Sequence, residues 1–157
     1  MGSPTKYPQQ TWRRFGSPGH FICARNCRFH LCTLVGEYLV STVGELWFER
    51  PVREIHAQVH DPQWLAKNRH RKGDDFDAVY MERFGFEEIG LGRKYETMVF
   101  KAGDPCKAEG CNCGLPSIDP SELDGGSYND AGAAAAGHMD LCLKWANGVP
   151  ATEAANG

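Results

Sequence analysis

The sequence predicts an α+β fold, in which an antiparallel sheet carries two or more packed helices and a cysteine-rich loop is tied to the C-terminal helix. Residues 28–34 alternate as a strand does, and residues 38–43, after a short turn, are rich in β-branched and aromatic side chains. Residues 95–101 alternate with apolar side chains on both faces, which is typical of a strand buried on both sides. Packed helices are expected at 76–84, which has an apolar face, and at 128–145, which has an alanine-rich middle.

The chain has 157 residues, which is long enough for one domain with a core of its own. We expect a single domain over residues 21–147. The segment before it, residues 1–20, is rich in proline and glycine and is predicted to be a flexible arm. Residues 148–157 follow the last predicted helix and are expected to form a disordered tail.

The middle of the chain is open to more than one interpretation. Residues 45–59 are ambiguous: a proline interrupts them, and residues 52–59 fit either a strand or a short helix. Asp61 followed by Pro62 is a typical helix start, which predicts a helix over residues 63–71. Residues 103–126 are rich in glycine, proline and acidic side chains and are expected to form a loop.

Composition and charge argue against several classes of protein. The chain is 41% hydrophobic and 24% charged, as a globular domain is, and its net charge of −3 argues against a bulk nucleic-acid binder. No apolar run approaches the roughly 20 residues of a membrane span, and the N-terminus lacks the apolar core of a secretory signal. Seven cysteines, an odd number, argue against a secreted disulfide framework, so we expect a cytoplasmic protein.

The strongest chemical signal is a set of three cysteines, Cys106, Cys111 and Cys113, within eight residues of a glycine-rich segment. Zinc prefers four tetrahedral ligands, usually thiolate and imidazole. His138 or Cys142 is expected to supply the fourth, because they lie at i and i+4 and share one face of the last predicted helix. The alternatives are reduced, partly buried cysteines, or an iron–sulfur cluster.

A second set of potential metal ligands lies near the N-terminus, at Cys23, Cys27, His30 and Cys32. In a strand, His30 and Cys32 would lie on the same face. Metal binding is one interpretation. The other, which we favour, is that Cys23 and Cys32 are small core residues and that His30 is hydrogen-bonded to a neighbour.

A ligand site is predicted at the start of the 95–101 strand. Arg93 and Lys94 follow two glycines there, and Tyr95 offers an aromatic ring, with Arg28 or His30 expected close by. The arginine could pair with a phosphate and the ring could stack on a base. The competing interpretation is a solvated strand edge in which Arg93 pairs with a nearby glutamate, and such an exposed pair contributes little to stability.

A basic run and a pair of histidines are two weaker candidates. The basic run over residues 67–72 could contact phosphates, but acidic residues flank it and favour a self-neutralising surface. His56 and His60 have helical spacing and could bind a metal. The chain contains no serine-hydrolase elbow, no phosphate-binding loop and no zinc-protease motif.

Several blocks of the sequence together resemble a family of small proteins of tailed bacteriophages, for which no activity is assigned. The blocks are residues 27–33, 38–45, 93–100, 111–116, 122–124, 128–131 and 137–145. The resemblance covers roughly residues 20–146 and carries over no catalytic residue. It implies a phage accessory protein made in the bacterial cytoplasm.

We therefore expect a phage accessory protein with a structural zinc site that binds a host component. It would inhibit a host defence by sequestering a nucleotide-like ligand or by blocking a host protein. Nucleic acid is a less favoured partner, a membrane is not expected, and a homo-oligomer is left open. The alternative is a zinc-dependent enzyme that acts on a small phosphorylated or nucleic-acid substrate.

Overall fold

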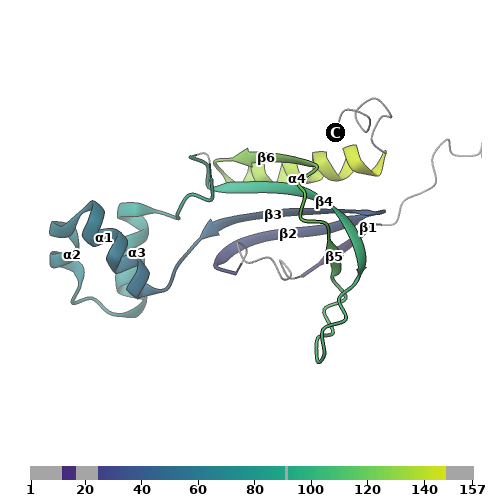
Figure 1. Cartoon of the computed structure of the whole chain (residues 1–157). Coiled ribbons are helices and arrows are strands. Elements are labelled where there is room, and N and C mark those ends of the chain that lie inside the picture. The colour runs from purple at the N-terminus through teal and green to yellow at the C-terminus, as the bar shows by residue number, and fades with distance from the viewer. Residues whose placement is uncertain (1–11, 17–24, 91, 148–157) are drawn as a thin grey trace, which may run out of the picture.

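The computed structural model describes residues 12–16, 25–90 and 92–147, and it confirms the α+β class. A six-stranded antiparallel sheet forms the body, with four helices (Figure 1). The strands are β1 (Trp12–Phe15), β2 (Cys27–Val35), β3 (Tyr38–Leu46), β4 (Tyr95–Pro105), β5 (Pro116–Ile118) and β6 (Asp124–Tyr128). The helices are α1 (Arg50–His60), α2 (Pro62–Asn68), α3 (Gly73–Phe84) and α4 (Ala131–Ala146).

The sheet is built around the β2–β3 hairpin and the long strand β4. The strand order is β1-β2-β3-β4-β5, and β6 pairs with the first half of β4. The predicted hairpin is confirmed: Val35 pairs with Tyr38 across a two-residue turn. Gly36 has a φ of 58° in this turn, a conformation that glycine adopts without a steric penalty.

One face of the sheet is covered by α4, which contacts β2, β3, β4 and β6 (Figure 1). Val35, Val40 and Val99 from three neighbouring strands pack there against Cys142 and Trp145 of the helix. Burial of these apolar side chains removes them from water and is the main stabilising term at this face. The helix predicted at 128–145 therefore packs on the sheet as expected.

The start of α4 differs from the prediction by about one turn. Tyr128 belongs to β6, where it pairs with Tyr95 of β4. The helix begins after Asp130, whose side chain accepts a hydrogen bond from the Ala133 N–H at 2.8 Å. Residues 103–126, expected to be a loop, contain the end of β4, all of β5 and most of β6. The pairing of β6 with β4 joins residues that are distant in the chain, so local composition does not indicate it.

Strand β1 lies within the segment that was expected to be a flexible arm. Its residues pair with β2, and Phe15 is buried beside Cys32, Leu39 and Leu115 on the face opposite α4. This part of the arm is therefore an ordered edge strand. Residues 1–11, residues 17–20 and the predicted tail at 148–157 lie outside the described residues.

The helices α1, α2 and α3 form a separate helical unit beside the sheet (Figure 1). Ala57, Leu65, Phe76 and Tyr80 make up its buried core. Helix α3 was predicted to pack on the sheet, but the structure places its aromatic face against α1 and α2 instead. The physical reason is that Trp64 of α2 meets the rings of that face, with ring centroids at 5.8 Å from Phe76 and 6.0 Å from Tyr80.

The segment that fitted either a strand or a helix forms α1, with its proline in the first turn, where no backbone donor is lost. Arg53 of α1 is 5% exposed and joins the helical unit together. Its Nε donates to the Phe48 carbonyl at 2.9 Å, and its Nη2 lies 2.8 Å from the Asp77 carboxylate. The guanidinium also lies 4.3 Å from the ring centroid of Trp47.

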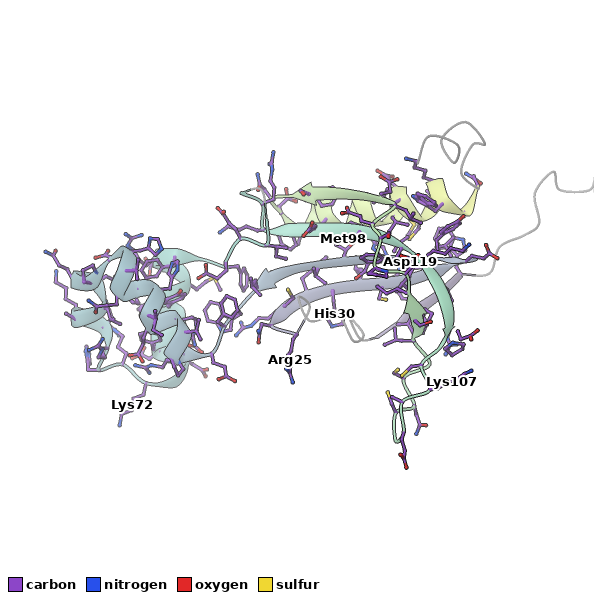
Figure 2. All side chains as sticks on the ribbon, in the orientation of Figure 1. Arg25, His30, Lys72, Met98, Lys107 and Asp119 are labelled. Atoms are coloured by element: carbon purple, nitrogen blue, oxygen red, sulfur yellow. The ribbon has the colours of Figure 1, made fainter. Side chains whose placement is uncertain are left out.

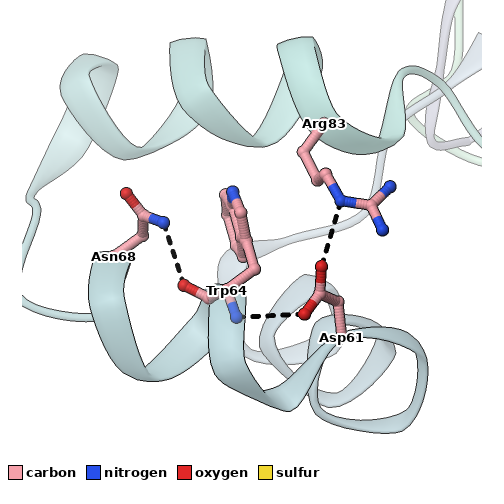
Figure 3. Close-up of polar contacts among 4 residues, drawn as sticks. All are labelled: Asp61, Trp64, Asn68 and Arg83. Carbon is pink, nitrogen blue, oxygen red and sulfur yellow. Dashed lines mark hydrogen bonds and ion pairs between the residues drawn. The ribbon is translucent and has the colours of Figure 1, made fainter.

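The predicted helix start at Asp61 is confirmed, although the helix ends at Asn68, three residues earlier than expected (Figure 3). The Asp61 carboxylate accepts from the Trp64 N–H at 3.1 Å and from Arg83 at 3.1 Å. The Trp64 N–H has the larger effect of the two donors, and together they hold the pKa of Asp61 below its ordinary value.

Among the residues described, no helix has the length and apolar character needed to cross a membrane.

Candidate metal centre

Three cysteine side chains meet at the tip of the hairpin that joins β4 to β5. The sulfur atoms of Cys106, Cys111 and Cys113 all lie within 4.8 Å of one another, and the three residues are half-buried. Figure 2 shows sulfur atoms gathered near the labelled Lys107, where this hairpin projects from the body of the sheet. These three residues are called the cysteine trio below.

The backbone of the hairpin brings the trio together. Pro105 pairs with Pro116 at the base, and the Cys106 N–H donates to the Leu115 carbonyl at 2.6 Å. The Cys111 N–H donates to the Ala108 carbonyl at 3.0 Å, which closes a tight turn within the tip. Two glycines of the tip have positive φ values, 76° at Gly110 and 67° at Gly114, so the chain reverses there without strain.

Interactions among the trio change the pKa of Cys111. The backbone N–H of Cys113 lowers the pKa of the Cys111 thiol, but other effects outweigh it. Hydrogen bonds with the Cys113 and Cys106 thiols, together with some loss of hydration, raise the pKa overall. A metal ion bound by thiolates must displace these protons, so binding would release protons to solvent.

The predicted fourth ligands do not reach the trio. His138 is 1% exposed beneath α4, where its Nε2 lies 2.8 Å from the Thr33 hydroxyl and its Nδ1 lies 2.7 Å from the Thr42 hydroxyl. Cys142 is buried in the core between α4 and the sheet. In the described part of the chain, the set of residues close enough to share an ion consists of the trio. The cysteine-rich loop is therefore not tied to α4 through these side chains.

The N-terminal set of cysteines and histidine is divided between the two faces of the sheet. Cys27 lies on the same side as α4, whereas His30 and Cys32 alternate to the opposite side, as their positions along β2 require. Cys32 is fully buried, and burial, with a smaller contribution from Cys142, raises its pKa to about 11. Cys32 is thus a core residue, as favoured above, and Cys23 lies outside the described residues.

The prediction for His30 is wrong in one respect. Its Nδ1 is buried and has no hydrogen-bond partner in the described structure, whereas a satisfied side chain was expected. The residue is labelled in Figure 2, on β2.

The residues of the predicted ligand site are divided between the two faces of the sheet. Tyr95 is 7% exposed on the α4 side of the sheet, where its hydroxyl donates to Glu45 at 3.2 Å and its ring contacts Phe29 at a centroid distance of 5.3 Å. The ring is therefore unavailable for stacking on a base. Arg28 and His30 lie on the opposite face, and Arg28 stacks 4.5 Å from the centroid of the Trp47 ring.

Arg93 and Lys94, which also belong to the predicted ligand site, lie in the tight connection that precedes β4. The Ile89 N–H donates to the Arg93 carbonyl and the Arg93 N–H donates to the Gly90 carbonyl, both at 2.9 Å. The Lys94 ammonium lies 3.0 Å from the position of a Cβ built on Gly85. Within the described residues Arg93 forms no ion pair, so the expected pairing with Glu88 or Glu96 is also not seen.

We expect Arg93→Ala to leave the free energy of unfolding within about 0.5 kcal/mol of the wild type. The side chain is exposed and makes no ion pair in the described structure, and alanine keeps the backbone hydrogen bonds of the turn. Urea unfolding followed by circular dichroism measures the difference. A loss of more than about 1 kcal/mol would show that the guanidinium has a stabilising contact.

The two weaker signals also have a structural account. The basic run is partly neutralised, because Arg69 lies 3.6 Å from Glu54 and Arg71 lies 3.3 Å from Asp75. The rings of His56 and His60 on α1 are tilted by 38° to one another, with centroids 4.3 Å apart. They do not join a group of ligands as compact as the trio.

Comparison of the chain with protein-family models, with curated proteins and with solved structures finds no match in any of the three. The cysteine trio is accordingly identified by its geometry alone. The structure adds to the sequence pattern that the three cysteines lie close enough together to hold a metal ion.

Proposed function

We propose that the protein is a zinc-binding protein and that the cysteine trio supplies three thiolate ligands to the ion. The single observation that carries this proposal is the approach of all three sulfur atoms to within 4.8 Å of one another. Soft thiolates select zinc, copper(I) and iron–sulfur clusters, and zinc is the ion among these that a structural loop most often holds. The ion would fix the hairpin tip.

Zinc content of the purified protein tests the proposal. We expect about one zinc per chain in protein prepared without chelator, and a small fraction of that in Cys111→Ser, because two thiolates hold zinc far more weakly than three. Cys142→Ala is the matched control: it also removes a thiol, but one that is buried in the core away from the trio. Elemental analysis measures both. A wild-type protein without zinc, or equal loss from the two variants, would contradict the proposal.

One observation favours a second function, that of a zinc-dependent enzyme. Structural zinc sites usually have four protein ligands, whereas catalytic sites have three and keep one position open. The trio supplies three in the described residues. A cobalt-substituted protein separates the two functions. Its visible spectrum changes on addition of a small external thiol if the fourth position is open, and stays unchanged if another protein group fills it.

We further propose that the protein is a phage accessory protein that binds a host protein in the bacterial cytoplasm. The dispersed ligand site counts against the nucleotide-sequestering version of this idea. Support for a protein partner comes from α1, where three aliphatic side chains at i, i+3 and i+7 are exposed to solvent. They are Val52 at 47%, Ile55 at 65% and Val59 at 71% exposure.

Native mass spectrometry of the protein isolated from infected bacteria would test this proposal. It reports the metal, the oligomeric state and any bound chain or small molecule in one measurement. A zinc-loaded protein that is found throughout infection without any bound host protein would count against it.

A further inference from the structure

We propose that Arg13 of β1 is a positioning residue of the metal centre, and that its guanidinium offsets the negative charge of metal-bound thiolates. This inference rests on the proposed zinc-binding function. A Cβ built on Gly114, the residue after Cys113, would lie 3.2 Å from Nη2 and 3.8 Å from Cζ of Arg13. The guanidinium therefore packs directly on the backbone that carries the third thiol, although the two residues are about a hundred positions apart in the chain.

The pairing of β1 with the sheet places Arg13 beside the hairpin tip. Arg13 pairs with Leu34 of β2, which puts its side chain on the face opposite α4, the same face as Phe15 two residues later. Its Cζ lies 5.0 Å from the centroid of the Phe15 ring. Phe15 and Leu115 are buried in one cluster, against which Cys113 packs, so strand β1 and the hairpin tip share a core.

Arg13 also brings a positive charge to the hairpin. The described residues contain no ion pair between Arg13 and a carboxylate. Three thiolate charges against the two charges of zinc leave a net charge of minus one on the filled centre. A guanidinium beside it lowers the electrostatic free energy of the filled centre, and the effect at an exposed position is modest and sensitive to salt.

The hairpin is shaped to admit this side chain. Gly114 has a φ of 67°, and a Cβ there would make a tight contact, 3.2 Å, with Nη2 of the Arg13 guanidinium. A side chain at position 114 would strain the backbone and press against the Arg13 guanidinium. The glycine thus allows the close approach that the proposed role of Arg13 needs.

The neighbouring Arg14 provides a matched control. It pairs with Thr33 and so lies on the α4 side of the sheet, away from the trio. Arg14→Gln removes the same charge from the same strand, one position away, but from the other face.

The test is the zinc dissociation constant of full-length variants, measured by competition with a chromogenic chelator at low and at high salt. We expect Arg13→Gln to bind zinc roughly threefold to tenfold more weakly than wild type at low salt, with Arg14→Gln unchanged. Arg13→Lys keeps the charge and is expected to retain most of the affinity. The difference should shrink at about 1 M salt, where the Debye length is only about 3 Å.

Three results would overturn the role of Arg13. Equal affinity of wild type and Arg13→Gln would remove it, and loss of affinity in Arg13→Lys as large as in Arg13→Gln would assign the residue to packing rather than charge. A difference in affinity between wild type and Arg13→Gln that does not depend on salt would also assign the residue to packing. Zinc bound equally by wild type and Arg13→Gln would overturn this inference alone, whereas absence of zinc from the wild type would overturn the proposed function as well.

Discussion

Lowering the pH from 7 to 4 is expected to remove about 3 kcal/mol from the free energy of unfolding through His138 alone. Burial, and to a smaller extent the positive charge of Arg14, lowers the pKa of His138 from 6.5 to about 4 in the folded protein. Between these two values the unfolded chain binds a proton that the folded protein does not bind. Acid therefore favours unfolding, and the stabilisation that is present above pH 6.5 is lost progressively down to about pH 4.

The structural cause is a chain of buried hydroxyls around the imidazole. Thr33 and Thr42 contact the two ring nitrogens, and the Thr42 hydroxyl lies 2.6 Å from that of Thr97 on β4. These contacts join α4 to three neighbouring strands. They satisfy a neutral ring, in which one nitrogen donates and the other accepts. Protonation would place an unpaired charge in the core beneath α4, which is costly.

Urea unfolding at several pH values between 7 and 4.5 measures the loss. His138→Gln is the control variant: it is less stable at pH 7, but its stability should be nearly independent of pH in this window. Asp61, Asp119 and Asp124 also have lowered pKa values, and their contribution is lost only at lower pH and in both proteins. An NMR titration that finds His138 of the folded protein protonating near pH 6.5 would contradict the prediction.

Gly137→Ala is expected to destabilise the protein by about 2 kcal/mol, although alanine is the better helix former. A Cβ built on Gly137 would overlap the hydroxyl and ring of Tyr128, because α4 packs closely on β6 at this point. Such overpacking costs about 1–3 kcal/mol, here at the upper end, and offsets the gain of about 1 kcal/mol in helix propensity. The midpoint of thermal unfolding should fall by about 4–8 °C.

The same helix supplies the control. Gly132 lies in the first turn of α4, where a Cβ would have the Asp130 carboxylate at 3.3 Å as its nearest neighbour. Gly132→Ala should therefore change stability by less than about 1 kcal/mol. The double variant Tyr128→Ala with Gly137→Ala should lose less than the sum of the single variants, because the ring that is overlapped is gone. Calorimetry that finds Gly137→Ala as stable as Gly132→Ala would show that α4 and β6 are not in close contact.

The sequence by itself determined the features that depend on near neighbours in the chain. Alternation and a glycine turn predicted the β2–β3 hairpin, and Asp61 before Pro62 predicted the start of α2. The sequence also places Cys106, Cys111 and Cys113 within one short segment, and the turn within that segment brings their sulfur atoms to within 4.8 Å of one another. In each case the geometry follows from local backbone preferences, which act over a few residues.

Only the tertiary structure decided which way each face of a helix or strand points and which residues pack against it. His138 and Cys142 do share a face of α4, but that face packs on the sheet rather than toward the trio. Tyr95 follows Arg93 closely in the chain, yet its position along β4 places it on the opposite face from Arg28 and His30. The assignment of Arg13 to the metal centre comes from the pairing of β1 with β2 and from the core that β1 shares with the hairpin. Side-chain periodicity is a local property, whereas the partner of a face is set by long-range packing that no short segment encodes.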